Sequence, residues 1–264
     1  FNKIDNQSSS DWIKKEINEL KNINNLEIKT RTSVAAYHGY NYLLARENLT
    51  DHLENKDKNN KVRQRLLKIR AKKVILATGA LERPLIFNNN DRPGIMLSTA
   101  VKKYADFFGV KCGEKNVFFT NNDSAYESAL CLYNKGIKVD AIIDIRNNSN
   151  SKIVKAVEQI GIQIYWSHTV VDTNGYRRLN NISIMKLSND GMTVTGDRIN
   201  ISCDCLGVGG GWTPAVHLFT QSGGKLKFDE DNNVFLPNKY PSDQISVGSC
   251  NGYFNLKEII NELS

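Results

Sequence analysis

The chain has 264 residues, of which 40% are hydrophobic and 24% charged, and this length and composition predict one large or two modest globular domains. No run of eighteen apolar residues occurs, which excludes a membrane-spanning helix, and the opening FNKIDNQSSSDW lacks the apolar core of a signal peptide and is typical of the middle of a longer gene product. The net charge of +7 would suit a nucleic-acid partner, but no aromatic residues interleave the basic cluster for base stacking, so none is expected.

The first third of the chain is expected to be a helix followed by strands. Ser and Asp caps and apolar residues at helical spacing predict a helix from Trp12 to about Lys21. Strands are predicted in LEIKTRTSV, YHGYNYLLARE, VRQRLLKIRA and KKVILATGA, with a hairpin tip in ENKDKNNK. The seven basic residues between Lys61 and Lys73 are interpreted as a solvated strand face whose lysines protect a sheet edge.

From Lys115 onwards, strands and helices alternate in the pattern of a parallel βαβαβ sheet. The predicted segments are strand 116–120, helix 123–135, strand 139–145, helix 151–160 and strand 162–170. NNISIMKL and RINISCDCLGVG return to strands, and TPAVHLFTQSG predicts a helix with Thr213 as cap, Pro214 in the first position and Gly223 at the end. The block 112–198 is therefore expected to be inserted between two sheet-rich flanks that meet in space.

The five cysteines do not form a metal or redox motif. They are Cys112, Cys131, Cys203, Cys205 and Cys250, and no C-x-x-C pair occurs among them. Cys203 and Cys205 share one face of a predicted strand, which is not a zinc-ligand spacing. The sequence therefore predicts reduced, mostly buried thiols, no metal site and a cytoplasmic location.

Two predicted strands end in glycine at positions far apart in the sequence. VILATGA, from Val74 to Ala80, is a continuous apolar run that ends in Thr78 and Gly79, where a ligand can approach the backbone closely. QISVGSCNGYFNLKEIINELS repeats this pattern with a buried strand, Gly248, Asn251 and Gly252, and then a helix at 254–263 whose first amides favour an anion such as pyrophosphate. A tight strand-to-helix turn explains either motif alone, but both together favour a cofactor site. Its predicted residues are Thr78, Gly79, Ala80, Gly248, Asn251 and Gly252.

The loop TNNDSA, 120–125, has the place of a glycine-rich phosphate loop but contains no glycine. Asn121 and Asn122 add side chains where pyrophosphate would approach, and Asp123 is suited to cap the next helix with a carboxylate that repels phosphate. We therefore predict a retained fold with a lost nucleotide site. A polar loop that faces a partner subunit is the alternative.

The segment ALERPLIFNNNDRPGIML places charged residues directly after the first glycine edge. Internal ion pairs of Glu82, Arg83, Asp91 and Arg92 are one interpretation. The other is that Arg83 or Arg92 faces a cofactor phosphate or a flavin, because Arg binds phosphate in a bidentate manner. His217 has a possible acid/base role but is more typical of a core or interface group. No Ser/His/Asp or Cys/His spacing occurs, so no catalytic residue is assigned.

The two glycine edges with a βαβ block between them resemble the two-domain FAD/NAD(P)-binding, pyridine nucleotide-disulfide oxidoreductase-like proteins. A-T-G-A-x-E-R-P (77–84), N-D-R-P-G (90–94) and G-W-x-P-A-V-H-L-F-x-Q-S-G-G-K (211–225) are long and unusual motifs. They resemble the α subunit of heterotetrameric sarcosine oxidase, and the likeness covers most of 62–264. Residues 12–46 fit this likeness more loosely.

The resemblance implies an α/β fold with a discontinuous outer NAD-binding domain, 1–111 and 199–264, and an inner βαβ domain, 112–198. It also implies a complex that demethylates sarcosine to glycine, yields hydrogen peroxide and passes the one-carbon unit to tetrahydrofolate. In that family NAD is bound by the α subunit, FAD lies in the β subunit and FMN lies between the two. Val34 would lie under the adenine of NAD, and Arg83 would belong to the cofactor site. Related α subunits serve proline, opine and other amino-acid dehydrogenases.

Two parts of that family are missing from the sequence, the glycine loop that should precede Phe1 and the folate-binding domain that should follow Ser264. Without the glycine loop, pyrophosphate loses most of its binding site, so the chain alone is expected to bind NAD weakly or not at all. The alternatives are a stand-alone NAD(P)H-dependent flavin oxidoreductase, which should carry loop glycines and a redox cysteine pair, and a non-enzymatic scaffold for assembly.

Overall fold

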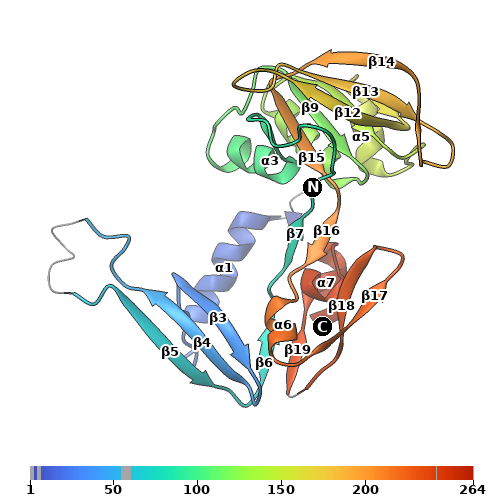
Figure 1. Ribbon diagram of the computed structural model, residues 1–264. Helices are drawn as coiled ribbons and strands as arrows, with labels where there is room; N and C mark the ends of the chain where they lie inside the picture. The colour runs from blue at the N-terminus through green and yellow to red at the C-terminus, as the bar shows by residue number, and fades with distance from the viewer. Residues whose placement is uncertain (1–2, 5–6, 55–60, 242, 264) are drawn as a thin grey trace.

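The computed structural model describes residues 3–4, 7–54, 61–241 and 243–263 and shows two units joined by a two-stranded ribbon (Figure 1). We call residues 95–209, at the top of Figure 1, the inner unit, and the remaining residues the outer unit. The outer unit has two arms, one made of the N-terminal sheet and the other of the C-terminal strands and helices. The predicted hairpin tip ENKDKNNK falls for the most part outside the described residues.

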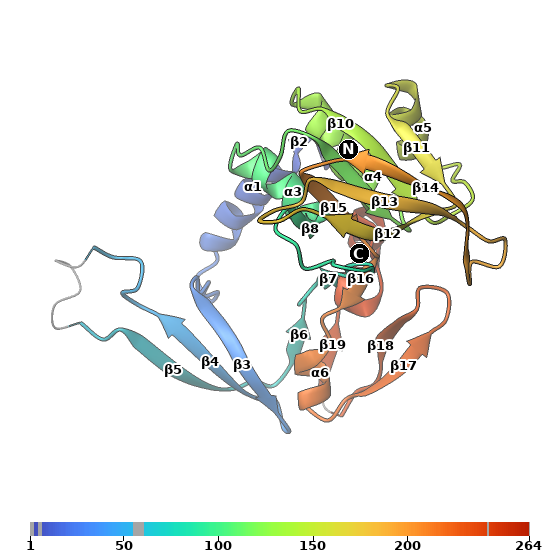
Figure 2. The same cartoon turned by 45° about the horizontal axis from the view of Figure 1, so that its top comes forward.

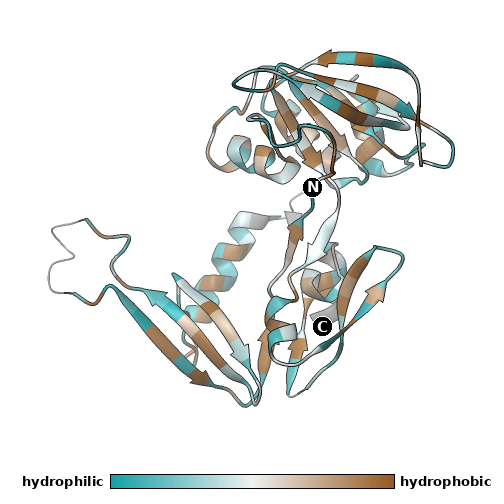
Figure 3. Cartoon of the chain, viewed as in Figure 1, coloured by the Kyte–Doolittle hydropathy of each residue, from teal (hydrophilic) through white to brown (hydrophobic). Residues whose placement is uncertain are grey.

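The N-terminal arm consists of one helix and an antiparallel sheet. After the short pair β1 (Lys3–Ile4) and β2 (Gln7–Ser8), helix α1 (Ser9–Lys21) begins earlier than predicted because the Ser8 hydroxyl accepts a hydrogen bond from the Asp11 amide at 3.1 Å. The sheet has the strands β3 (Thr32–His38), β4 (Tyr42–Asn48) and β5 (Gln64–Arg70), in that order. Apolar residues lie along all three strands (Figure 3), but of these strands only Tyr37, Leu43 and Ala45 are buried.

The inner unit is built on a five-stranded parallel sheet in the order β11-β10-β9-β15-β8. Its strands are β8 (Ile95–Leu97), β9 (Asn116–Thr120), β10 (Val139–Asp144), β11 (Gln163–Trp166) and β15 (Cys205–Gly209). Its helices are α3 (Ser98–Phe107), α4 (Ser124–Asn134) and α5 (Lys152–Gln159). Every residue of β9 and β15 is buried, as expected for central strands that are covered on both faces.

The two faces of this sheet are covered by different elements. Phe118 and Ile142 pack with the residues of α3, α4 and α5. Val117 and Ile143 point to the opposite face and pack with Ile182 and Ile184, which belong to a three-stranded antiparallel sheet. That sheet has the strands β12 (His168–Asn174), β13 (Asn181–Leu187) and β14 (Val194–Ser202). The inner unit is therefore a three-layered structure.

The parallel sheet of the inner unit extends beyond the predicted block, 112–198, at both ends. The sheet takes β8, with α3 behind it, from before residue 112, and β15 from after residue 198. Since β15 lies between β8 and β9, these elements cannot be separated from the parallel sheet. The predicted strand 162–170 is in fact two strands, which are broken at Ser167, where φ is 55°.

In the C-terminal arm, β6 (Val74–Leu76) pairs with β19 (Gln244–Ser246) in parallel. Around this pair lie α6 (His217–Gln221), the hairpin of β17 (Lys225–Asp229) and β18 (Val234–Lys239), the 3₁₀ helix η1 (Gly248–Asn251) and α7 (Leu256–Leu263). The ribbon to the inner unit consists of β7 (Ala80–Glu82) and β16 (Trp212–Pro214), which are antiparallel.

The helix predicted to begin at Thr213 and Pro214 is wrong at its start. Both residues lie in β16, where they pair with Leu81 and Ala80, and the helix begins only at His217. Pro214 is tolerated here because a two-stranded ribbon has an edge that needs no amide donor.

Candidate functional site

The two glycine edges of the sequence meet in the structure. β6 and β19 are neighbours, with Leu76 opposite Ser246, and the Val247 amide donates to the carbonyl of Leu76 at 2.9 Å. The thiol of Cys250 donates to the same carbonyl at 3.2 Å. The chain segments that carry Gly79 and Gly248 therefore leave the same end of two paired parallel strands.

The A-T-G turn is held by contacts to the chain that follows the ribbon. The Thr78 hydroxyl donates to the carbonyl of Ala215 at 2.7 Å, and the Ala215 amide donates to the carbonyl of Gly79 at 2.9 Å. Gly79 has a φ of 74°, and a Cβ built on it would meet no atom within 4 Å. Glycine is thus required by the backbone conformation, and the space beside it is open. Ala80 follows in β7.

The second glycine edge leads into helix α7 through a short 3₁₀ helix. Gly248 begins a four-residue 3₁₀ helix, and α7 begins only at Leu256. The anion site at the first amides of α7 stays a prediction. Asn251 and Gly252 end the 3₁₀ helix, and Gly252 has the left-handed φ of 94° that a tight turn requires.

The remaining predicted cofactor residues lie elsewhere. Val34 is 40% exposed and belongs to β3, in the sheet of the N-terminal arm. Arg83 follows β7 at its inner-unit end, and its Nη1 donates to the carbonyl of Asn233 at 3.0 Å. Arg92 binds the inner unit through the Thr173 hydroxyl and the Gly175 carbonyl. The loop after the ribbon is therefore held mainly by hydrogen bonds to neutral groups, and within the described ranges neither Arg83 nor Arg92 forms the ion pair that the first interpretation expected.

The glycine-free loop of the inner unit satisfies its own helix start. The side-chain oxygen of Asn122 accepts from the Ser124 amide at 3.0 Å and from its hydroxyl at 2.6 Å, and the Asn122 side-chain nitrogen donates to the carbonyl of Gly209 at 3.0 Å. Asn122 therefore caps α4, and the prediction that Asp123 does so is wrong. Asp123 has helical backbone angles, and its side chain makes no cap hydrogen bond.

The carboxylate of Asp123 instead binds Arg146, which lies two residues after β10. Arg146 donates to Asp123 at 2.8 Å and, through Nη2, to the fully buried Asp144 at 2.8 Å. The Tyr126 hydroxyl donates to Asp144 at 2.8 Å. Burial and the neighbouring Asp144 raise the pKa of Tyr126, while Asp144 and Asp123 raise the pKa of Arg146 against the effect of its burial.

This network lies at the two positions where a dinucleotide fold would contact ribose and phosphate. In a dinucleotide fold the acidic residue at the end of the second strand, here Asp144, would bind ribose, and the first loop would bind phosphate. Arg146 joins these two positions within the protein itself. Arg146 was not predicted from the sequence. The signal that could have found it is the acidic residue at the end of the second strand, Asp144, which stands two residues before Arg146.

A cavity of about 730 Å³ lies at the carboxyl ends of β9 and β15. This is the switch point of the parallel sheet, where α/β folds bind ligands. Residues of both units line it, among them Arg83, Asn121, Gly211, Trp212, Asn233 and Phe254. The Nε of Arg83 is buried without a hydrogen-bond partner.

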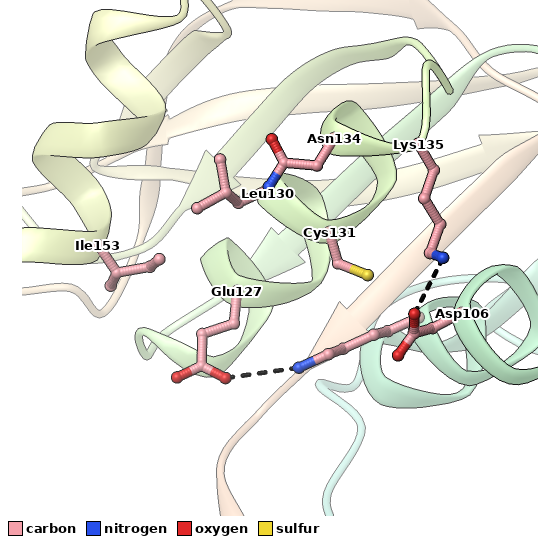
Figure 4. A pocket seen from close by; sticks show the side chains of 8 residues that line it. Asp106, Glu127, Leu130, Cys131, Asn134, Lys135 and Ile153 are labelled. Atoms are coloured by element: carbon pink, nitrogen blue, oxygen red, sulfur yellow. Dashed lines mark ion pairs between the residues drawn. The ribbon is translucent and has the colours of Figure 1, made fainter. Parts of the chain in front are cut away.

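A second cavity, of about 360 Å³, lies between α3 and α4 on the helical side of the inner unit (Figure 4). Its charges pair with one another, Lys102 with Glu127 at 3.6 Å and Lys135 with Asp106 at 3.0 Å. Burial raises the pKa of the Cys131 thiol, so it is not an activated nucleophile. His217 is exposed at the start of α6. Neither this cavity nor the start of α6 brings together a catalytic set of described residues.

The buried thiols predict a pH dependence of stability. Burial raises the pKa of Cys203 and Cys205 to about 12, from a usual value of 9.0. Above pH 9 the unfolded thiols lose protons that the native ones retain, so the free energy of unfolding should fall as the pH rises from 9 to 12. Urea unfolding at several pH values checks this. The Cys203→Ala/Cys205→Ala variant should show a shallower decline, and an equal slope would contradict the assignment.

Two kinds of feature are absent from the described residues. No helix there is long and apolar enough to cross a bilayer. No three side chains of His, Cys, Asp or Glu gather there to hold a metal ion.

The chain is similar in sequence to parts of known sarcosine oxidase α subunits. No protein-family profile matches it. The sarcosine oxidase subunit alpha of Corynebacterium sp. (strain P-1) is 36% identical over 254 residues, which are 96% of this chain and 26% of that subunit. That of Rhizobium meliloti (strain 1021) is 32% identical over 88% of this chain and 22% of its own length. The chain thus spans about a quarter of the length of the curated relatives it matches.

Solved structures show the same fold at low sequence identity. L-proline dehydrogenase from P. horikoshii has a TM-score of 0.64 at 20% identity, over 94% of this chain and 41% of its own. Bacillithiol disulfide reductase from Bacillus cereus has a TM-score of 0.65 at 14% identity, over 98% of this chain and 75% of its own. The predicted FAD/NAD(P)-binding, pyridine nucleotide-disulfide oxidoreductase-like fold is therefore confirmed. By sequence, the chain resembles the sarcosine oxidase α subunits over a stretch that is about a quarter of their length.

Proposed function

We propose that this chain is the NAD-binding part of the α subunit of a sarcosine oxidase-type complex. The observation that supports NAD binding is the pairing of β6 with β19, which brings the open turn at Gly79 beside the turn that starts at Gly248. Thr78, Ala80, Asn251 and Gly252 belong to the same two turns, and we assign NAD to this edge. Bound NAD would supply a nicotinamide ring, while the protein side contributes backbone contacts and no acid or base.

The complete complex is proposed to oxidise sarcosine to glycine with formation of hydrogen peroxide and to transfer the one-carbon unit to tetrahydrofolate. FAD and FMN are assigned to its partner subunits and their interfaces. Support comes from the relatives, which are named as α subunits of sarcosine oxidase. A related proline or opine dehydrogenase is the alternative, since a proline dehydrogenase shares the fold. The five free cysteines support a cytoplasmic location.

The two-domain division is proposed with revised limits. The outer NAD domain keeps residues 1–94 and 210–264 of the expected 1–111 and 199–264, and the inner domain extends from 112–198 to 95–209. The inner domain is assigned no nucleotide, because Arg146 and Asn122 fill the contacts that ribose and phosphate would use. A stand-alone flavin reductase is disfavoured for the same reason, and because the buried thiols have raised pKa values.

NAD content of the purified complex tests the assignment with a matched pair of variants. Gly79→Ala places a methyl group beside the proposed backbone contact and should abolish bound NAD. Gly136→Ala is the control, because Gly136 has nearly the same φ, 73° against 74°, and equally open space, so both changes carry a similar backbone cost of about 1 kcal/mol. NAD released by denaturation and measured by absorbance gives the result. Equal amounts of bound NAD in the two variants would show that NAD does not bind beside Gly79.

A further inference from the structure

The chain passes between the outer and inner units twice, in the two strands of the ribbon. Figure 2 shows the ribbon of β7 and β16 between the two units. Glu82, the last residue of β7, lies opposite Trp212, the first residue of β16. The hydrogen-bonded ladder extends one residue further, because the Arg83 amide donates to the Gly211 carbonyl at 2.8 Å and the Gly210 amide donates to the Arg83 carbonyl at 2.7 Å. The loop 85–94 is bound to the inner unit, through Arg92 and Thr173 among others, and so moves with it. Units joined by so narrow a ribbon are ordinarily free to move relative to each other.

Glu82 binds the inner unit at the start of α3. Its carboxylate is buried and accepts hydrogen bonds from the Ser98 hydroxyl at 2.5 Å, the Thr99 amide at 3.0 Å and the Thr99 hydroxyl. Leu97, the residue at the cap position of α3, has an apolar side chain that cannot accept a hydrogen bond from the helix start. Glu82 therefore caps a helix of the inner unit from the ribbon, and its charge is stabilised by the positive end of the helix dipole.

Arg83, the next residue, points to the other side, as successive side chains of an extended strand do. Its Nη1 donates to the carbonyl of Asn233, in the turn between β17 and β18 of the outer unit. Two adjacent residues thus bind opposite units, one through a helix start and the other through a hairpin turn.

Three glycines make room for this arrangement. A Cβ on Gly209 would lie 3.2 Å from the Glu82 carboxylate and from the Ser98 hydroxyl. A Cβ on Gly210 would lie 2.9 Å from the carbonyls of Arg83 and Pro84, and a Cβ on Gly211 would lie 3.0 Å from the Arg83 guanidinium. The G-G-G sequence is therefore explained by close packing against residues 82–84.

We propose that Glu82 and Arg83 form a two-sided clamp that holds the inner unit in one orientation on the outer unit. The 730 Å³ cavity at the switch point has walls from both units, including Arg83 itself, so the clamp also fixes the shape of that cavity. The hinge that would let the units rotate has to lie in the ribbon ends, and the clamp occupies them.

Amide residual dipolar couplings test this orientation directly, because each unit reports its own alignment tensor. In the wild-type protein both units should share one tensor. Glu82→Ala and Arg83→Ala should each cause loss of the common tensor, while couplings within each unit still fit its own structure. Glu82→Gln, which keeps the side-chain volume and removes the charge, is the substitute where Glu82→Ala does not fold.

Ser151→Ala is the matched control, because the Ser151 hydroxyl caps α5 inside the inner unit and contacts no other unit. It should lower the melting temperature and leave the common tensor intact. If the Glu82 and Arg83 variants also keep the common tensor, the two residues are only structural and the clamp is refuted.

Discussion

Replacing Arg146 with alanine should destabilise the inner unit by about 3–5 kcal/mol, because the change leaves the carboxylate of Asp144 buried without its cation. Asp144 has no exposed surface, and Arg146 binds it through the backbone amide, Nε and Nη2. Arg146 also holds Asp123, so the loss would free the loop before α4 from the end of β10. Urea unfolding followed by Trp fluorescence measures the effect, since Trp166 stacks on Tyr126 beside the network.

Two further variants test whether the unpaired charge of Asp144 causes this loss of stability. Arg178→Ala removes an arginine whose contact to the Asp204 carboxylate is 3.8 Å and largely exposed, so it should cost less than about 1 kcal/mol. Asp144→Asn in the Arg146→Ala background removes the uncompensated charge and should recover part of the lost stability. An Arg146→Ala protein as stable as the Arg178→Ala protein would show that the network contributes nothing.

The same network explains why opening the phosphate loop alone should not create a nucleotide site. Asp123→Gly removes one carboxylate, but Asn122 still caps α4 and Arg146 still covers Asp144. Binding of NAD by the inner unit of that variant, measured by calorimetry, would show instead that Asp123 merely masks an intact site.

The sequence predicted the alternation of strands and helices because apolar runs and glycine turns are local signals. It also predicted that VILATGA and ISVGSCNG meet, and the β6–β19 pair confirms this. The helix α3 was not predicted, since STAVKKYADF starts after Leu97 without a capping side chain and takes its cap from Glu82, sixteen residues earlier in the chain. Contacts of this kind depend on how the chain returns to itself, which no local pattern contains.

The roles of the glycines also depend on contacts between distant residues, which the local sequence does not contain. Those of CLGVGGGW have a packing role, because a Cβ built on any of them would lie within 3.2 Å of another atom. Only at Gly79 is a positive φ combined with open space beside a proposed site, so the type of residue alone did not distinguish a binding glycine from a packing glycine.

Gly207 provides the strongest test of that packing role. It lies in β15 directly opposite Phe118 of β9, and a Cβ on Gly207 would lie 2.6 Å from two atoms of the Phe118 ring. Phe118 is fully buried in the centre of the sheet and has no space to retreat. Gly207→Ala should therefore destabilise the inner unit by about 1–3 kcal/mol through overpacking, as measured by the urea midpoint.

Gly39→Ala is the matched control, because Gly39 has no left-handed φ and a Cβ there would meet no atom within 4 Å. That change should leave stability within about 0.5 kcal/mol of the wild type. Phe118→Leu in the Gly207→Ala background shortens the opposing side chain, so it should restore part of the loss if the ring is the cause. If Phe118→Leu instead adds its full cost to that of Gly207→Ala, the two residues do not compete for the same space and the packing explanation for this glycine fails.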